Sequence, residues 1–153
     1  MKKVIALLAF LLASTTTFPA LAQEGMEIVQ SEYSVEETED RLVNTLKVNG
    51  LTIFEKVNHK EGAASVNLNL LPSTVIIFGN PKLGTPLMQC APTVAIDLPQ
   101  KMLIWEDKTG KVKVGYNNPD YLKKRHAIEG CDQELQKISG ALQTFAQSAA
   151  KDT

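Results

Sequence analysis

The stretch FGNPKLGTPLM, residues 78–88, decides how this chain folds, because it joins a buried strand to a helix near the middle of the sequence. The residues that lead into it, Val75–Phe78, are β-branched or aromatic and suit a buried strand. Gly79 and Pro81 then end the strand, since glycine and proline interrupt regular structure.

Two helix starts are predicted in this stretch. Asn80 is a good cap for a helix with Pro81 at its first position, and Thr85 is a good cap for a second helix that begins at Pro86. Proline is harmless at a first helical position because the missing N–H would have no partner there.

The beginning of the chain has the pattern of a secretory signal peptide. Lys2 and Lys3 precede the apolar run Val4–Ala13, and Ala20-Leu21-Ala22 supplies a small-x-small cleavage site. The run is shorter than the ~20 apolar residues of a membrane span. We therefore expect cleavage after Ala22 and an exported protein, periplasmic in a bacterium, with no membrane association after cleavage.

The remaining chain, residues 23–153, is long enough for one domain with its own core and short for two. The net charge of the full sequence is −1, and it becomes more negative when Lys2 and Lys3 leave with the leader. A mildly acidic chain lacks the basic surface that general nucleic-acid binding requires. We expect no nucleic-acid partner and no cofactor.

The two cysteines, Cys90 and Cys131, lie far apart in the sequence and form neither a Cys-x-x-Cys motif nor a zinc knuckle. In an oxidising compartment they suit a structural disulfide, which would stabilise the fold by about 3–4 kcal/mol through loop closure. Two independent free thiols are the alternative.

The predicted order of elements is β-α-β-α-β-α-β-β-α-α, a compact α+β domain whose mostly antiparallel sheet of about five strands carries helices on one face. The predicted strands cover residues 27–33, 51–57, 75–78, 101–106 and 111–116. The predicted helices cover about 35–48, 58–66, 85–98 in one or two pieces, 120–127, and a last segment capped by Asp132. The first helix opens with a capping box, Ser34 to Glu37, and the four residues 107–110 indicate a hairpin.

Several short motifs together resemble the domain of unknown function 302 family. They are Asn58-His59 with Ala63-Ala64, Phe78-Gly79-Asn80-Pro81, Gly84-Thr85-Pro86-Leu87-Met88, Asp97-Leu98-Pro99, Trp105-Glu106-Asp107, Tyr116-Asn117 with Pro119, Tyr121-Leu122, and Arg125-His126. The resemblance covers most of the mature chain and implies a compact α+β domain that tends to form homodimers. The family usually has Asp where this chain has Asn58, and no catalytic residues come with the family name.

The two histidines, His59 and His126, are the obvious candidates for metal or haem chemistry. No local spacing resembles a known ligand pattern, although Glu61 or Asp120 would be a possible third ligand. The simpler interpretation is that His59 packs beside its strand and that His126 ends a helix, where a cation complements the dipole.

A denser polar set lies near the end of the chain and comprises Tyr116, Asn117, Tyr121, Arg125 and His126. If the last strand of the hairpin lies beside the central strand, this set approaches the turn at Asn80. Arg125 is then placed to bind a carboxylate or phosphate, and the helix starts at Asn80 and Thr85 offer backbone N–H groups to an anion. The alternative is that the asparagines stabilise turns and the tyrosines fill the edge of the core.

Gly79 and Gly84 have the spacing of a phosphate-binding loop, but Thr85-Pro86 follows where Lys-Ser/Thr is required. No Gly-x-Ser-x-Gly motif is present. The sequence therefore favours a non-catalytic domain that binds a small ligand, such as an anion, or a protein partner. A metal- or haem-assisted redox protein using His59 or His126 is one alternative, and a purely structural assembly domain is another.

Overall fold

The structure, a computed structural model, describes residues 25–152, so the predicted signal peptide lies outside the described residues. Its centre is a five-stranded, fully antiparallel sheet with the strand order β1-β5-β4-β3-β2. The strands are β1 (Met26–Gln30), β2 (Thr52–Asn58), β3 (Ser73–Gly79), β4 (Gln100–Glu106) and β5 (Val112–Asn117).

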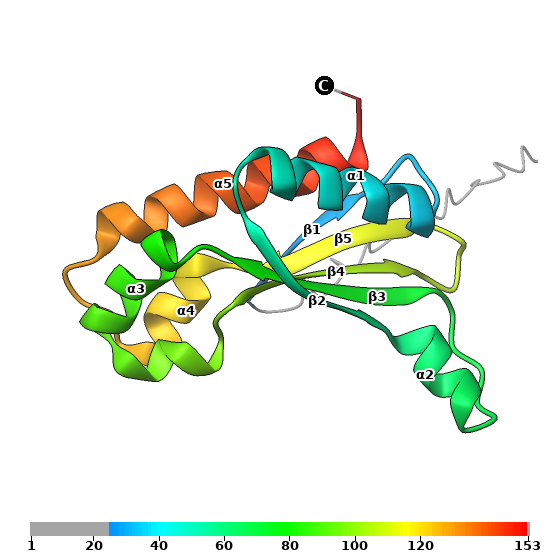
Figure 1. Cartoon of the computed structure of the whole chain (residues 1–153), viewed down its shortest axis with the longest axis horizontal. Coiled ribbons are helices and arrows are strands. Elements are labelled where there is room, and N and C mark those ends of the chain that lie inside the picture. Colours follow the sequence, from blue (N-terminus) through cyan, green and yellow to red (C-terminus); the bar gives the residue numbers. More distant parts are fainter. Residues whose placement is uncertain (1–24, 153) are drawn as a thin grey trace, which may run out of the picture.

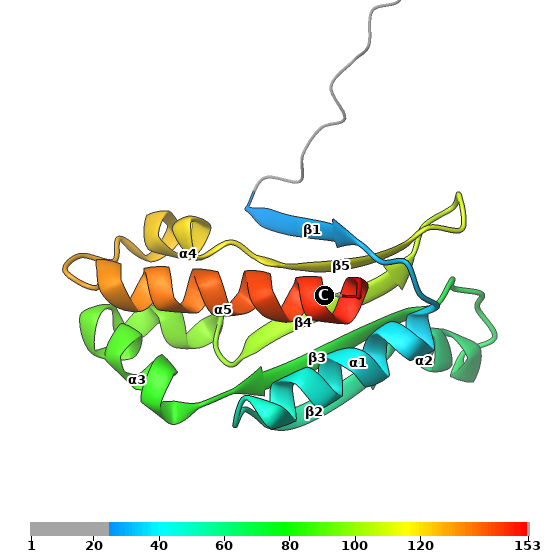
Figure 2. The same cartoon turned by 90° about the horizontal axis from the view of Figure 1, so that it is seen from above.

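Two long helices, α1 (Val35–Val48) and α5 (Asp132–Ala150), cover one face of this sheet. Figures 1 and 2 show that the shorter helices lie at the two ends of the molecule, with α2 (His59–Ser65) at one end and α3 (Pro81–Cys90) and α4 (Pro119–His126) at the other. A 3₁₀ turn, η1 (Pro92–Ile96), follows α3. No helix in residues 25–152 is both long and apolar enough to cross a membrane. The predicted α+β class and element order are confirmed.

The core forms where alternate strand residues meet the helices. Ile76 and Phe78 on β3 and Met102 and Ile104 on β4 point to the covered face and are at most 1% exposed. Leu142 on α5 packs into the same cluster. This alternation follows from the period-two side-chain pattern of strands.

The predicted hairpin is present, and of the predicted capping box the structure shows the half in which Ser34 caps the helix. The Ser34 side chain accepts a hydrogen bond from the Glu37 N–H at 3.1 Å, which satisfies one of the free donors of α1. In the hairpin between β4 and β5, Asp107 accepts hydrogen bonds from the backbone N–H groups of Thr109 and Lys111.

Three local predictions were wrong. Thr85 does not start a helix: α3 runs from Pro81, as the Asn80 cap predicted, and Pro86 lies inside it. The first strand ends at Gln30, short of the predicted residue 33, and Asp132 is the first residue of α5, with Cys131 at the cap position. The Asp132 carboxylate instead forms an ion pair with Lys123 of α4, and this contact explains its place in the first turn.

The position of the hairpin in the sheet also differs from the one that would bring the polar residues of β5 and α4 to Asn80. β4 lies between β5 and β3, so the last strand of the hairpin is not beside the central strand. Tyr116 on β5 is paired with Met102 and Glu27. The polar residues of β5 and α4 therefore do not approach the turn at Asn80 through the sheet.

Candidate functional site

The residues around the Asn80 turn line a cavity of about 260 Å³ between α3, α5 and the adjoining ends of β3 and β4. Its walls are almost wholly apolar, and no charged side chain is among the residues that line it. The lining residues are Leu51, Phe54, Phe78, Gly79, Asn80, Pro81, Leu83, Gly84, Thr85, Met88, Ala95, Leu98, Pro99, Gln100, Ile138, Ala141, Leu142 and Phe145.

Asn80 and Thr85, two of the sequence-predicted site residues, are in this wall. The start of α3 nevertheless has no free donor for an anion. Pro81 has no N–H, the Lys82 N–H donates to the Asn80 side chain at 2.9 Å, and the Leu83 and Gly84 N–H groups donate to the Asn80 carbonyl oxygen. The N–H groups in the first turn of α3 thus have their hydrogen-bond partners within that turn. They add no free donor to the apolar wall of the cavity.

Gln100 is the exception in this apolar wall. It is the first residue of β4, opposite Phe78 in the register, and it shares the covered face with Met102 and Ile104. Only 9% of the residue is exposed, and its Nε2 atom is buried without a hydrogen-bond partner among the described residues. A buried amide that lacks a partner is costly, and such a group in a native structure calls for an explanation.

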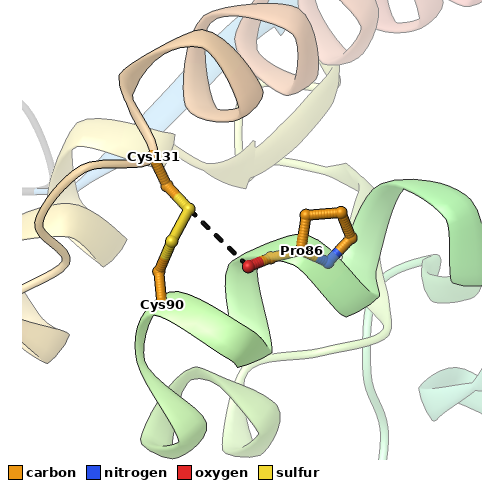
Figure 3. Close-up of a disulfide and its surroundings, with 3 residues drawn as sticks. All are labelled: Pro86, Cys90 and Cys131. Atoms are coloured by element: carbon orange, nitrogen blue, oxygen red, sulfur yellow. Dashed lines mark hydrogen bonds between the residues drawn. A yellow bond between two sulfur atoms is a disulfide. The ribbon is translucent and has the colours of Figure 1, made fainter.

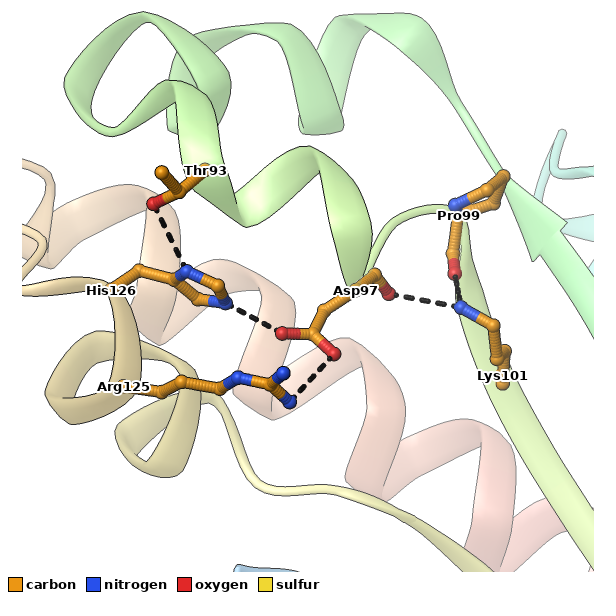
Figure 4. Close-up of polar contacts among 6 residues, drawn as sticks. All are labelled: Thr93, Asp97, Pro99, Lys101, Arg125 and His126. Carbon is orange, nitrogen blue, oxygen red and sulfur yellow. Dashed lines mark hydrogen bonds and ion pairs between the residues drawn. The ribbon is translucent and has the colours of Figure 1, made fainter.

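Arg125 and His126 meet a different partner, Asp97, which follows η1 (Figure 4). The His126 Nε2 atom lies 2.5 Å from one carboxylate oxygen of Asp97, and the Arg125 Nη1 atom lies 3.3 Å from the other. The second ring nitrogen of His126 is 3.1 Å from the Thr93 hydroxyl. Lys101 donates to the carbonyl oxygen of Asp97, so this aspartate is held from several sides.

This cluster joins the end of α4 to η1 rather than facing the cavity. His126 is the last residue of α4, where a cation is favourable, as the simpler interpretation of the sequence had it. Only 6% of its side chain and 12% of that of Asp97 are exposed. The contact between His126 and Asp97 therefore links the end of α4 to the residue that follows η1, and this structural role accounts for both side chains.

The other residues predicted from the sequence lie apart from both the cavity and the cluster around Asp97. His59 is the exposed first residue of α2, at the opposite end of the molecule from α4 (Figure 1). Tyr116 is a core residue, 5% exposed, and burial raises the pKa of its hydroxyl above the usual value. Asn117 ends β5 opposite Met26, and the Tyr121 ring lies against Gly25, where an added Cβ would come within 2.6 Å of it.

No group of three or more His, Cys, Asp or Glu side chains in residues 25–152 is arranged to hold a metal ion. The two histidines do not share a site, because one begins α2 and the other ends α4. The described part of the chain thus offers no observation that favours the metal or haem hypothesis.

Cys90 and Cys131 are placed at disulfide distance, with their Cα atoms 6.5 Å apart (Figure 3). Cys90 is the last residue of α3 and Cys131 immediately precedes α5, so the pair connects the two helices whose side chains form opposite walls of the cavity. The Cys131 sulfur also lies 3.6 Å from the carbonyl oxygen of Pro86.

Residues 27–145 match the model of a family described as domain of unknown function DUF302. The chain belongs to the DUF302 family. A crystal structure of an uncharacterised conserved DUF302 protein from Bacillus stearothermophilus has the same fold, with a TM-score of 0.75 at 19% identity over 84% of this chain and 99% of the other. The recognition made from the short motifs is confirmed.

Curated relatives of this DUF302 protein are named as fluoride-specific ion channels. It is 41% identical over 109 residues to the fluoride-specific ion channel FluC 1 of Brucella suis biovar 1, and equally so to FluC 2 of Brucella melitensis biotype 1. These matches cover 71% of this chain and 43% and 40% of the two relatives. The chain thus spans about two-fifths of their length, and the named activity is a property of the longer proteins.

Sequence reasoning missed Gln100 as a site residue. The predicted strand began one residue later, at Lys101, so the alternation of Gln100 with Met102 and Ile104 was not used. A polar residue in phase with the buried side of a strand is the signal that would have found it.

Proposed function

We propose that this DUF302 protein is a binding domain for a small, largely apolar molecule, which it holds in the cavity under α3. The observation that carries the proposal is the cavity itself: about 260 Å³, bordered by two helices and two strand ends, with apolar walls. Ligand sites are typically concave and mostly apolar with a few polar groups, and this cavity is slightly smaller than their usual volume of about 300–1,000 Å³.

The cavity volume sets the size of the ligand portion that the cavity can enclose. At the packing density of protein interiors, ~0.74, a volume of 260 Å³ holds a molecule with a van der Waals volume of about 190 Å³, or roughly a dozen non-hydrogen atoms. A ligand of about a dozen atoms binds with a Kd of about micromolar to millimolar if each atom contributes about 0.3–0.7 kcal/mol, which is typical of ligand efficiencies below the ceiling for the smallest ligands.

The geometry changes the kind of ligand that the sequence suggested. A small anion was expected near Asn80 and Thr85, but the first-turn donors of α3 are already used and no cation lines the cavity. Arg125 is engaged with Asp97 outside the cavity. We therefore propose an apolar ligand in place of the anion.

We further propose that the protein acts after export, in the periplasm of a bacterium. The support is the signal-peptide pattern before Gln23 and the placement of Cys90 and Cys131 at disulfide distance, which suits an oxidising compartment. The homodimer that the family resemblance implies stays a prediction, and light scattering of the purified mature protein tests it.

Binding is tested with isopropylbenzene, an apolar probe of suitable size, added to the ¹⁵N-labelled mature protein. Amide shifts in α3, α5 and the end of β3 are expected to move with saturation. An Ala141→Phe variant places a ring in the cavity and should abolish the shifts, whereas Gln143→Phe, at an exposed position of the same helix, should keep them. Absence of binding, or equal binding by the two variants, would contradict the proposal.

A further inference from the structure

We propose that a second copy of this chain binds to the uncovered face of the sheet and to the arm that projects beside it. The arm comprises residues 59–72, that is, α2 and the segment that connects α2 to β3. The uncovered face is the side of the sheet opposite to α1 and α5, and Figure 1 shows α2 on that side, at one end of the strands. The surface is distinct from the cavity, which lies between α3 and α5 near the other end.

The arm has no core of its own. None of the residues of α2 is buried, and the four aliphatic side chains that follow it are exposed to 43–65%: Val66, Leu68, Leu70 and Leu71. The sequence from Gly62 to Pro81 contains no charged residue. Single exposed apolar residues are ordinary on protein surfaces, whereas a group of them in one place marks an interaction site.

The arm has a defined conformation before any partner binds. The Leu68 N–H donates to the carbonyl oxygen of Ala63 at 2.9 Å, and the Asn67 N–H donates to that of Ala64 at 3.1 Å. Asn67 adopts the left-handed conformation, with φ of 59°, which asparagine tolerates better than most residues. The aliphatic side chains are therefore presented on a preformed turn, and this lowers the entropic cost of binding.

A row of apolar residues crosses the uncovered face from one edge of the sheet to the other. Its members lie opposite one another in the register of neighbouring strands: Val57 of β2, Val75 of β3, Leu103 of β4, Gly115 of β5 and Ile28 of β1. In β3, β4 and β5 they alternate with the residues of the covered face, so the row faces away from α1 and α5. The residues at its two ends, Val57 and Ile28, are 37% and 42% exposed.

The lysines on the uncovered face already have partners. The Lys113 Nζ atom lies 2.7 Å from the Asp107 carboxylate, and Lys101 donates to the backbone carbonyl oxygen of Pro99 at 2.9 Å. Glu55 also lies on this face, but its strand, β2, is at the edge of the sheet. A charge at the edge falls in the rim of an interface, where polar groups are usual.

The size of the surface suits an interface between two protein chains. The arm and the outward positions of the five strands together comprise about 25–30 residues, which is the number that each side of a stable interface contributes. Because the arm and the apolar row lie on the same side of the molecule, a twofold axis allows the same patch to be buried on both copies.

A lipid surface fits this patch less well than a second copy. A bilayer would meet the projecting arm but not the sheet, which lies behind it (Figure 1). The segment after α2 also has no Lys or Arg to attract anionic headgroups.

Sedimentation equilibrium of the mature protein tests the proposal. At about 100 µM, above the micromolar upper end of Kd for interfaces of this size, the wild type should have twice the mass of the chain. The double variant Leu68→Asp/Leu70→Asp should raise the dissociation constant of the dimer about a hundredfold or more, because it places four unpaired charges in an apolar interface. Both leucines are exposed in the single chain, so this variant should fold, and far-UV circular dichroism checks that it does.

Two further variants test the extent of the interface. Ile28→Lys, in the apolar row, should raise the dissociation constant about tenfold or more for the same reason. Val48→Asp is the matched control, since Val48 is an aliphatic residue of α1 that is 78% exposed and lies outside the proposed surface. It should dimerise like the wild type.

The contrary results are specific. A wild type that is monomeric at this concentration overturns the proposal, as does a Leu68→Asp/Leu70→Asp variant that dimerises as tightly as the wild type. Unchanged dimerisation of Ile28→Lys would overturn the assignment of the sheet face. A monomeric wild type that co-sediments with vesicles of phosphatidylcholine and phosphatidylglycerol, when the arm variant does not, would show that the arm binds a lipid surface in place of a second copy.

Discussion

Replacing Gln100 by methionine should make the protein more stable. The two side chains are similar in length and volume, so the change removes an unpaired amide from an apolar wall and leaves little void. A buried polar group without a partner costs about 1–3 kcal/mol, and the 9% exposure of Gln100 places it toward the lower end. We expect an increase in the free energy of unfolding of about 1–2 kcal/mol.

For a domain of this length, such an increase corresponds to a rise in Tm of roughly 3–10 °C. Urea unfolding of the ligand-free mature protein measures it, with the fluorescence of Trp105, the one tryptophan, and far-UV circular dichroism as independent probes. Gln143→Met, at an exposed position on α5, should change the stability by less than about 0.5 kcal/mol. If Gln100→Met is destabilised by 1 kcal/mol or more, the amide is paired in solution, and the reasoning about stability is refuted.

Three further predictions concern other parts of the fold. Gly140→Ala should stabilise the protein by about 0.5–1 kcal/mol, because Gly140 lies inside α5 and an added Cβ meets nothing within 4 Å; a lower urea midpoint would contradict this. Hydrogen bonds from Lys113 and then Thr109 hold the pKa of Asp107 well below its ordinary value of 3.8. Its ionised form therefore adds stability above about pH 4 that is lost as the pH falls through the lower, folded-state pKa. The stability difference between wild type and Asp107→Asn should accordingly shrink between pH 6 and pH 2, and a difference that is constant or grows toward low pH is the opposing result. Thiol titration of the unreduced, denatured mature protein should find no free thiol, and the double variant Cys90→Ser/Cys131→Ser should be about 3–4 kcal/mol less stable; two free thiols would show that no disulfide forms.

Much of the fold could be predicted because it depends on local patterns. The cap at Ser34, the apolar run into Phe78 and the four-residue link after Glu106 each identify an element without knowledge of its neighbours. The errors arose where tertiary contacts decide. Pro86 is tolerated inside α3, and Asp132 forms an ion pair with Lys123 and does not cap α5.

The candidate site could be predicted only in part. Asn80 and Thr85 line the cavity because they belong to the stretch that turns from β3 into α3, and this turn was recognisable. The opposite wall comes from α5. This helix is far from α3 in the sequence, so local sequence patterns do not predict that the two helices pack together. Arg125 and His126 were predicted as binding residues from their chemistry, but the sequence did not identify their partner Asp97, because η1 and α4 come together only in the folded chain.

The attachment of α3 at both ends has a consequence for the kinetics of ligand exchange. Its first residue follows directly from β3 through the Asn80 cap, and its last residue, Cys90, lies at disulfide distance from Cys131 at the start of α5. A helix fixed in this way does not swing outward as a lid. Phe54 and Leu83, which line the cavity and are 53% and 39% exposed, form its rim. Rotation of exposed side chains takes picoseconds to nanoseconds, whereas lid opening takes microseconds or longer, so a ligand should enter and leave without a slow opening step.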